Sequence, residues 1–188
     1  MTNDFDVYTF LPKASDKVLH KLEHIHGVRC IATLTGAYEA FAVATLESFD
    51  RLEGFLDRVR RLGDPVTAVG LKYSPQRIVW SPRPPILSFI QLNVDPKLVH
   101  AAFDKTLELA NDNLQHLGTT LVAGNFDLLI EVGGESFDLV RDSLLDVNQG
   151  LSKIDGLQSS VTSFGFIRYY RRPHYPDDQS AGGSGDGS

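Results

Sequence analysis

The chain contains an internal repeat, and this repeat constrains its fold more than any other feature. Residues 35–50 align without a gap to residues 123–138, at a constant offset of 88 positions (124 − 36 = 88). Gly36 matches Gly124, and the tetrapeptide Glu-Ser-Phe-Asp occurs at the same place in both segments. A duplicated sequence indicates a duplicated structural unit, so the chain is expected to contain two copies of one unit.

Hydrophobic periodicity predicts the same order of elements in each copy: strand, helix, strand, strand, helix, strand. In the first copy we expect strands over 6–10, 28–34, 38–45 and 66–73, with helices near 18–25 and 49–59. In the second copy we expect strands over 86–94, 119–123, 126–132 and 158–170, with helices over 96–117 and 137–147. The predicted fold class is α+β, with tandem ferredoxin-like βαββαβ units.

Some of the expected strands carry large apolar side chains on both faces. Ile90 and Leu92 alternate with Leu87 and Phe89 along one of them. The helices of a βαββαβ unit cover only one face of its sheet, so the other face needs a second cover. We therefore expect antiparallel four-stranded sheets to pack face to face as a dimeric α/β barrel, formed by the two halves of one chain or by units of different chains.

Proline marks the boundary between the two copies. Four of the eleven residues in 75–85 are proline, which predicts an extended, semi-rigid linker. The predicted domains are therefore residues 1–74 and residues 86–172. The last segment, 173–188, is polar and rich in glycine, and it is expected to be disordered.

Composition excludes several classes of protein. The net charge of −6 disfavours direct binding of nucleic acid, because that affinity comes largely from lysines and arginines that neutralise phosphates. Neither a secretion signal nor an apolar stretch long enough for a membrane helix is recognisable, and the single cysteine, Cys30, fits a reducing compartment. We expect a cytoplasmic protein with no membrane partner.

Short motifs around the repeat resemble the effector-binding (RAM) domain of the leucine-responsive (Lrp/AsnC) family of regulators. Its strand-turn-strand of the form T-G-x-Y/F-D is similar to residues 35–39 and, more closely, to residues 123–127. The segment 156–162, Gly-Leu-Gln-Ser-Ser-Val-Thr, also resembles the closing motif of that family. The usual N-terminal helix-turn-helix is not expected, since the first predicted strand begins a few residues after Met1.

The resemblance implies a regulatory protein that binds a small-molecule effector, for example an amino acid, near the turn between the second and third strands. A regulator of this kind is expected to need no cofactor and not to be an enzyme. It is expected to act by forming homo-oligomers or by associating with Lrp/AsnC relatives. The implied effector-binding residues are the turn positions of the two copies, namely Gly124, Asn125, Asp127, Gly36, Ala37 and Glu39.

Other interpretations stay open from the sequence. The glycines and acids of the turns can be purely structural, because glycine permits tight turns and a carboxylate can accept hydrogen bonds from turn amides. His20 and His24 have a spacing that can hold a metal on a helix, but no further ligand is identifiable, so a solvated face is favoured. The alternatives to a regulator are a barrel enzyme, haem-handling or oxygenase-like, and a purely structural assembly subunit.

Overall fold

The computed structural model describes residues 4–73, 84–111 and 116–171. Its first half contains β1 (Phe5–Leu11), α1 (Asp16–Glu23), β2 (Val28–Thr35), β3 (Ala40–Leu46), α2 (Asp50–Arg60) and β4 (Val66–Tyr73). Its second half contains β5 (Ile86–Val94), α3 (Val99–Asn111), β6 (His116–Gly124), β7 (Leu128–Gly134), α4 (Phe137–Leu151) and β8 (Leu157–Tyr170). The order of elements is the same in both halves, as the repeat predicts. Most of the predicted linker (75–83) and the tail 173–188 lie outside the described residues.

One predicted helix has the wrong boundaries. The apolar stripe over 96–117 assigns His116 and Leu117 to a helix, whereas α3 spans Val99–Asn111 and these two residues begin β6. Periodicity alone does not mark the end of a helix when the next strand also starts with apolar residues.

The eight strands form one closed antiparallel barrel in the order β1-β3-β2-β8-β5-β7-β6-β4, and β4 pairs with β1 to complete it. The predicted fold class is therefore wrong, because two separate ferredoxin-like sheets do not pack face to face. Instead β2 pairs with β8 and β4 pairs with β6, so the hydrogen bonds continue from one half into the other. Left unpaired, these four strands would expose edge amides and carbonyls, and the closure satisfies them.

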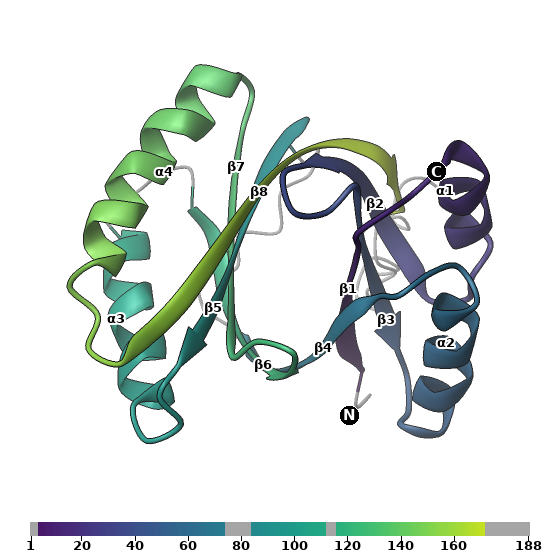
Figure 1. The fold of residues 1–188 in the computed structure, drawn as a ribbon, viewed down its shortest axis with the longest axis horizontal. Coiled ribbons are helices and arrows are strands. Elements are labelled where there is room, and N and C mark those ends of the chain that lie inside the picture. Colours follow the sequence, from purple (N-terminus) through teal and green to yellow (C-terminus); the bar gives the residue numbers. More distant parts are fainter. Residues whose placement is uncertain (1–3, 74–83, 112–115, 172–188) are drawn as a thin grey trace, which may run out of the picture.

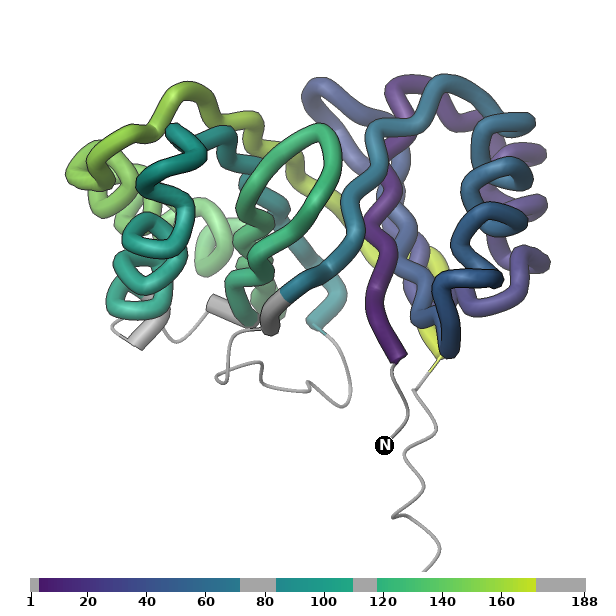
Figure 2. Tube along the Cα trace, turned by 90° about the horizontal axis from the view of Figure 1, so that it is seen from below, coloured from purple at the N-terminus to yellow at the C-terminus, as the bar shows by residue number. Residues whose placement is uncertain are grey.

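The helices lie outside the barrel in two pairs. In Figure 1, α1 and α2 flank one side of the strands and α3 and α4 flank the opposite side, and Figure 2 shows the same separation from below. Each pair packs on its own half through an apolar core. A third core fills the barrel and combines side chains of both halves, including Tyr8, Phe10, Phe41, Phe89 and Phe126. No helix among the described residues is long and apolar enough to cross a membrane.

Gly124 allows β6 to approach β4 closely where the halves meet. A Cβ atom added at this position would lie 2.4 Å from the Thr67 carbonyl oxygen and 2.8 Å from the Ala68 Cα. Ala68 is the register partner of Gly124. At the other junction, a Cβ on Gly36 would lie 3.3 Å from the Thr162 carbonyl oxygen of β8. The two repeated glycines thus lie where the barrel closes, and Gly124 has no room for a side chain.

A buried ion pair joins three strands of the first half. Arg29 donates through Nη2 to Asp6 Oδ2 and through Nε to Thr45 Oγ1, the latter at 2.7 Å. Thr45 Oγ1 donates in turn to Asp6 Oδ1 at 2.6 Å. The Arg29 and Asp6 side chains are only 11% and 5% exposed, so each charge depends on the other for compensation.

Replacing Gly124 by alanine should destabilise the fold by about 2 kcal/mol or more, because the added methyl group collides with backbone atoms of β4. Gly54, in α2, is the matched control, since a Cβ there meets nothing within 4 Å. Gly54→Ala should stabilise the protein by roughly 0.5–1 kcal/mol through helix propensity. Urea denaturation followed by circular dichroism measures both, and equal effects of the two variants would contradict the role given to Gly124.

Replacing Arg29 by methionine should lower the free energy of unfolding by about 3 kcal/mol, because it leaves the Asp6 carboxylate buried without its cation. The double variant Asp6→Asn/Arg29→Met should lose less than the single variant, since no charge is then buried alone. A double-mutant cycle in urea measures this coupling. Additive losses would show that the pair is not coupled.

Candidate functional site

Polar side chains point into the barrel between aromatic ones. Leu87 and Phe89 belong to the barrel core, so Gln91, two residues further along β5, shares their inward face. On β7, Leu129 lies opposite Gln91 and Glu131 lies opposite Phe89. Gln91 and Glu131 are therefore diagonal neighbours on one face, which places their Cα atoms roughly 7–8 Å apart. Each residue is only 4% exposed.

The buried amide of Gln91 is incompletely paired. Its Nε2 atom has no hydrogen-bond partner among the described residues. Burial raises the pKa of the Tyr38 hydroxyl, and the neighbouring Gln91 side chain acts in the opposite direction. Gln91 therefore interacts with the Tyr38 hydroxyl, although its Nε2 atom does not meet the geometry of a full hydrogen bond. A buried amide that is incompletely paired, next to a half-buried tyrosine, is a group that a ligand atom entering beside Tyr38 would meet.

Aromatic rings gather at the end of the barrel next to Gln91. The ring of Phe10 lies 5.2 Å from that of Tyr38, 5.8 Å from that of Phe126 and 5.9 Å from that of Phe89. Tyr38 and Phe126 occupy equivalent positions of the repeat, two residues after the turn glycines. The two repeated turns therefore converge over Phe10, at what we call the Tyr38 end of the barrel.

The acids of the predicted effector site bind backbone amides. Glu39 Oε2 accepts a hydrogen bond from the Ala14 amide at 2.8 Å, and Asp127 Oδ2 accepts one from the Val94 amide at 2.9 Å. In both halves the acid of the turn thus holds the chain at, or just after, the end of the first strand of its unit. The carboxylates have the same structural role in each copy, which explains their recurrence in the repeat.

The remaining residues of the predicted effector site lie in the same two turns. Gly36 and Gly124 lie against β8 and β4 as described above, and Ala37 is exposed. Asn125 Oδ1 accepts a hydrogen bond from the Thr67 amide at 3.3 Å, which joins the turn of the second half to β4 of the first. Direct contact of these turns with a small molecule is not tested by these observations and stays a prediction.

The histidines do not assemble a metal site in the described part of the chain. The His20 and His24 rings lie 4.6 Å apart on the exposed face of α1, and His24 Nδ1 lies 2.8 Å from the His20 carbonyl oxygen. Among residues 4–73, 84–111 and 116–171, no three His, Cys, Asp or Glu side chains lie together as a metal-binding group. The pair is therefore part of a solvated helix face.

The sequence interpretation missed Gln91 and Glu131. Glu131 is the only polar side chain of β7, in the run Leu-Leu-Ile-Glu-Val, and Gln91 lies between Ile90 and Leu92 in β5. A lone carboxylate or amide in a strand buried on both faces has to be paired or functional, and this signal could have identified them.

Comparison with known proteins identifies the fold. No protein-family model and no curated protein matches the sequence. Among solved structures, an anthrone oxidase-like protein matches with a TM-score of 0.62 at 9% identity, over 91% of this chain and 93% of its own. The siroheme decarboxylase NirDL matches with a TM-score of 0.61 at 8% identity, over 91% and 74%. A putative chlorite dismutase matches with a TM-score of 0.58 at 9% identity, over 89% and 95%. At identities this low, the TM-scores establish a shared fold and nothing more.

These neighbours correct the functional predictions. The chain was expected to be a non-enzymatic, Lrp/AsnC-type regulator involved in transcription. The three solved structures described above carry the names of an oxidase-like protein, a decarboxylase and a dismutase, which contradicts that expectation. Self-association stays a prediction.

Proposed function

We propose that the chain is a dimeric α/β-barrel enzyme of the oxygenase-like class, acting on a small, flat, largely aromatic molecule that carries a carbonyl or hydroxyl group. The observation that carries this proposal is the pair of buried polar side chains, Gln91 and Glu131, on one inward face of a largely apolar and aromatic barrel interior. The name of the anthrone oxidase-like neighbour supports the choice of substrate class.

In this proposal the substrate enters at the Tyr38 end. Tyr38 lies on the turn between β2 and β3, is half-buried, and packs on Phe10. A flat ligand would displace the Tyr38 ring and rest against Phe10 and Phe126, because aromatic rings favour such offset and edge contacts. The Gln91 amide would then donate a hydrogen bond to the carbonyl oxygen of the ligand, which completes the pairing of this buried group.

Glu131 is the proposed general base. Its carboxylate lies on the same inward face as Gln91 and is shielded from water. It would take a proton from a methylene group that the adjacent rings and carbonyl make acidic. The resulting carbanion passes electrons to dioxygen, the methylene carbon becomes a carbonyl, and the second oxygen atom leaves as water with the two methylene hydrogens. One dioxygen is consumed for each substrate molecule.

Neither Cys30 nor any histidine whose side chain the structure describes is placed to hold a haem, which the haem-handling alternative would need. Haem iron takes an axial ligand such as histidine, cysteine or tyrosine. His20, His24, His26 and His100 are all exposed on the outside of the molecule. Cys30 is fully buried in the barrel core, and the layers between helices and strands are filled by apolar side chains. No step of the proposed reaction uses a haem.

Replacing Gln91 by leucine should raise the stability of the fold and abolish ligand binding. The variant replaces a buried, incompletely paired amide with an apolar group, so the free energy of unfolding should rise by about 1 kcal/mol in urea denaturation. The increase in melting temperature that anthrone gives the wild type, measured by thermal shift, should be lost. Gln158→Leu, at an exposed position of β8, is the control and should leave binding unchanged. No stabilisation of the wild type by anthrone would refute the proposal and favour a purely structural protein.

Replacing Glu131 by glutamine should lower the rate of anthrone-dependent oxygen consumption, above the uncatalysed rate, by about 100-fold or more. Anthrone binding should persist, because the amide keeps the size of the carboxylate and only the base is removed. An oxygen electrode measures the rate, and Glu135→Gln, at an exposed position after β7, is the matched control. Unchanged oxygen consumption in Glu131→Gln would exclude this residue as the base.

A further inference from the structure

A pocket lies outside the barrel, between α2 and the loop that joins α1 to β2. Its volume is about 180 Å³, and its apolar part is formed by Ile25, Leu46 and Phe55. These three residues are buried members of the core between the first helix pair and the barrel. For comparison, one water occupies roughly 30 Å³ of the liquid, so the pocket can hold a molecule the size of a small organic acid.

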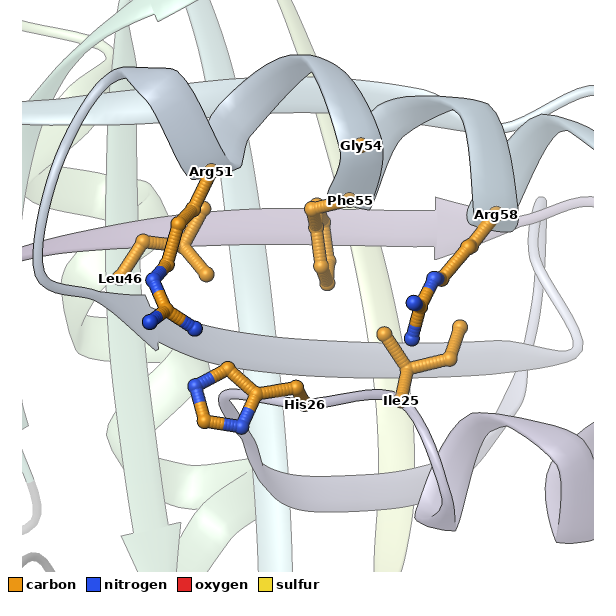
Figure 3. Close-up of a pocket in the computed structure, with 7 residues that line it drawn as sticks. All are labelled: Ile25, His26, Leu46, Arg51, Gly54, Phe55 and Arg58. Atoms are coloured by element: carbon orange, nitrogen blue, oxygen red, sulfur yellow. The ribbon is translucent and has the colours of Figure 1, made fainter.

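Two arginines and a histidine surround this apolar floor. Arg51 and Arg58 extend from α2 on either side of Phe55, and His26 extends from the facing loop (Figure 3). Arg51 Nε lies 3.9 Å from the carboxylate of the exposed Glu47, which is a loose pair. Arg58 forms no ion pair within the described part of the chain. The residues that line the pocket include two arginines and no carboxylate, which is what an anion site requires.

Gly54 keeps the pocket open. It lies in the interior of α2, where glycine costs about 1 kcal/mol relative to alanine. No packing contact explains it, because a Cβ built at this position meets no atom within 4 Å. Gly54 lines the pocket, so a longer side chain there would project into the space between Arg51 and Arg58. Access to the pocket therefore explains why position 54 has no side chain.

The loop that carries His26 is held in place. Gly27 follows it with φ of 89°, and its carbonyl accepts a hydrogen bond from the Thr45 amide at 2.9 Å. A Cβ on Gly27 would lie 2.8 Å from the Thr45 carbonyl oxygen. This close backbone contact positions His26 beside the end of β3 before any ligand arrives, which lowers the ordering cost of binding.

We propose that this pocket binds a small organic anion, a carboxylate or a phosphate monoester attached to a compact apolar group. The apolar group packs on Phe55, Leu46 and Ile25. The anionic group lies among the guanidinium groups of Arg51 and Arg58, whose planar donors suit carboxylate and phosphate oxygens. The site is separate from the barrel interior and does not depend on the proposed enzymatic function.

The test is a titration of the full chain with benzoate and with phenyl phosphate, followed by the Gly54 amide resonance and the His26 ring resonances in NMR spectra. We expect saturable shifts with a dissociation constant on the order of 1 mM for at least one of the two anions, and the tighter one identifies the anionic group. Benzyl alcohol, which is similar in size but neutral, should bind at least 10-fold more weakly.

Variants locate the binding. Arg58→Gln should weaken it about 10-fold, and Gly54→Leu should abolish it by filling the pocket while the fold is retained, as circular dichroism will verify. Arg60→Gln is the matched control, because Arg60 lies on the same helix, does not line the pocket and is 3.7 Å from Asp57. Equal binding of benzyl alcohol, unchanged binding in Gly54→Leu, or an equal loss in Arg60→Gln and Arg58→Gln would each overturn the proposal.

Discussion

At two places in the sheet, backbone hydrogen bonds pass from one half of the chain to the other, between β2 and β8 and between β4 and β6. Each pairing satisfies amides and carbonyls that would otherwise form an exposed edge. A hydroxyl contact of 3.2 Å between Tyr8 and Thr120 also joins the halves inside the barrel. Because the sheet closes, the inward faces of both halves share one interior, and every feature of the candidate site depends on this closure.

Closure also sets the chemistry of that interior. Side chains on the inward faces have little access to water, so the amide of Gln91 and the carboxylate of Glu131 are expensive to keep there. An apolar residue at either position would pack without that cost, and we therefore interpret the two buried polar groups as serving a ligand. The pocket beside α2 is different, because Arg51 and Arg58 remain largely in water and only their ligand would be partly desolvated.

Much of the local structure could be predicted. The apolar alternation of Leu87, Phe89 and their neighbours predicted strand β5, and the repeat predicted the same order of elements in each half. The candidate site could not be predicted in the same way. Gln91 and Glu131 each lie between two apolar residues of their strand, and their relation appears only when the register of β5 and β7 places them on one face. The turn acids Glu39 and Asp127 were predicted to bind an effector, whereas in the structure both accept hydrogen bonds from backbone amides.

The sequence by itself determined the duplicated unit, its strands and most of its helices, because these follow from side-chain periodicity and from residues near in the chain. Only the tertiary structure decided that the two halves close into one barrel, since this depends on pairing between strands far apart in sequence, such as β4 with β6. It also decided which polar residues face each other inside the barrel. Long-range register is set by packing and by close contacts such as that of Gly124 with Ala68, and neither leaves a local pattern in the sequence.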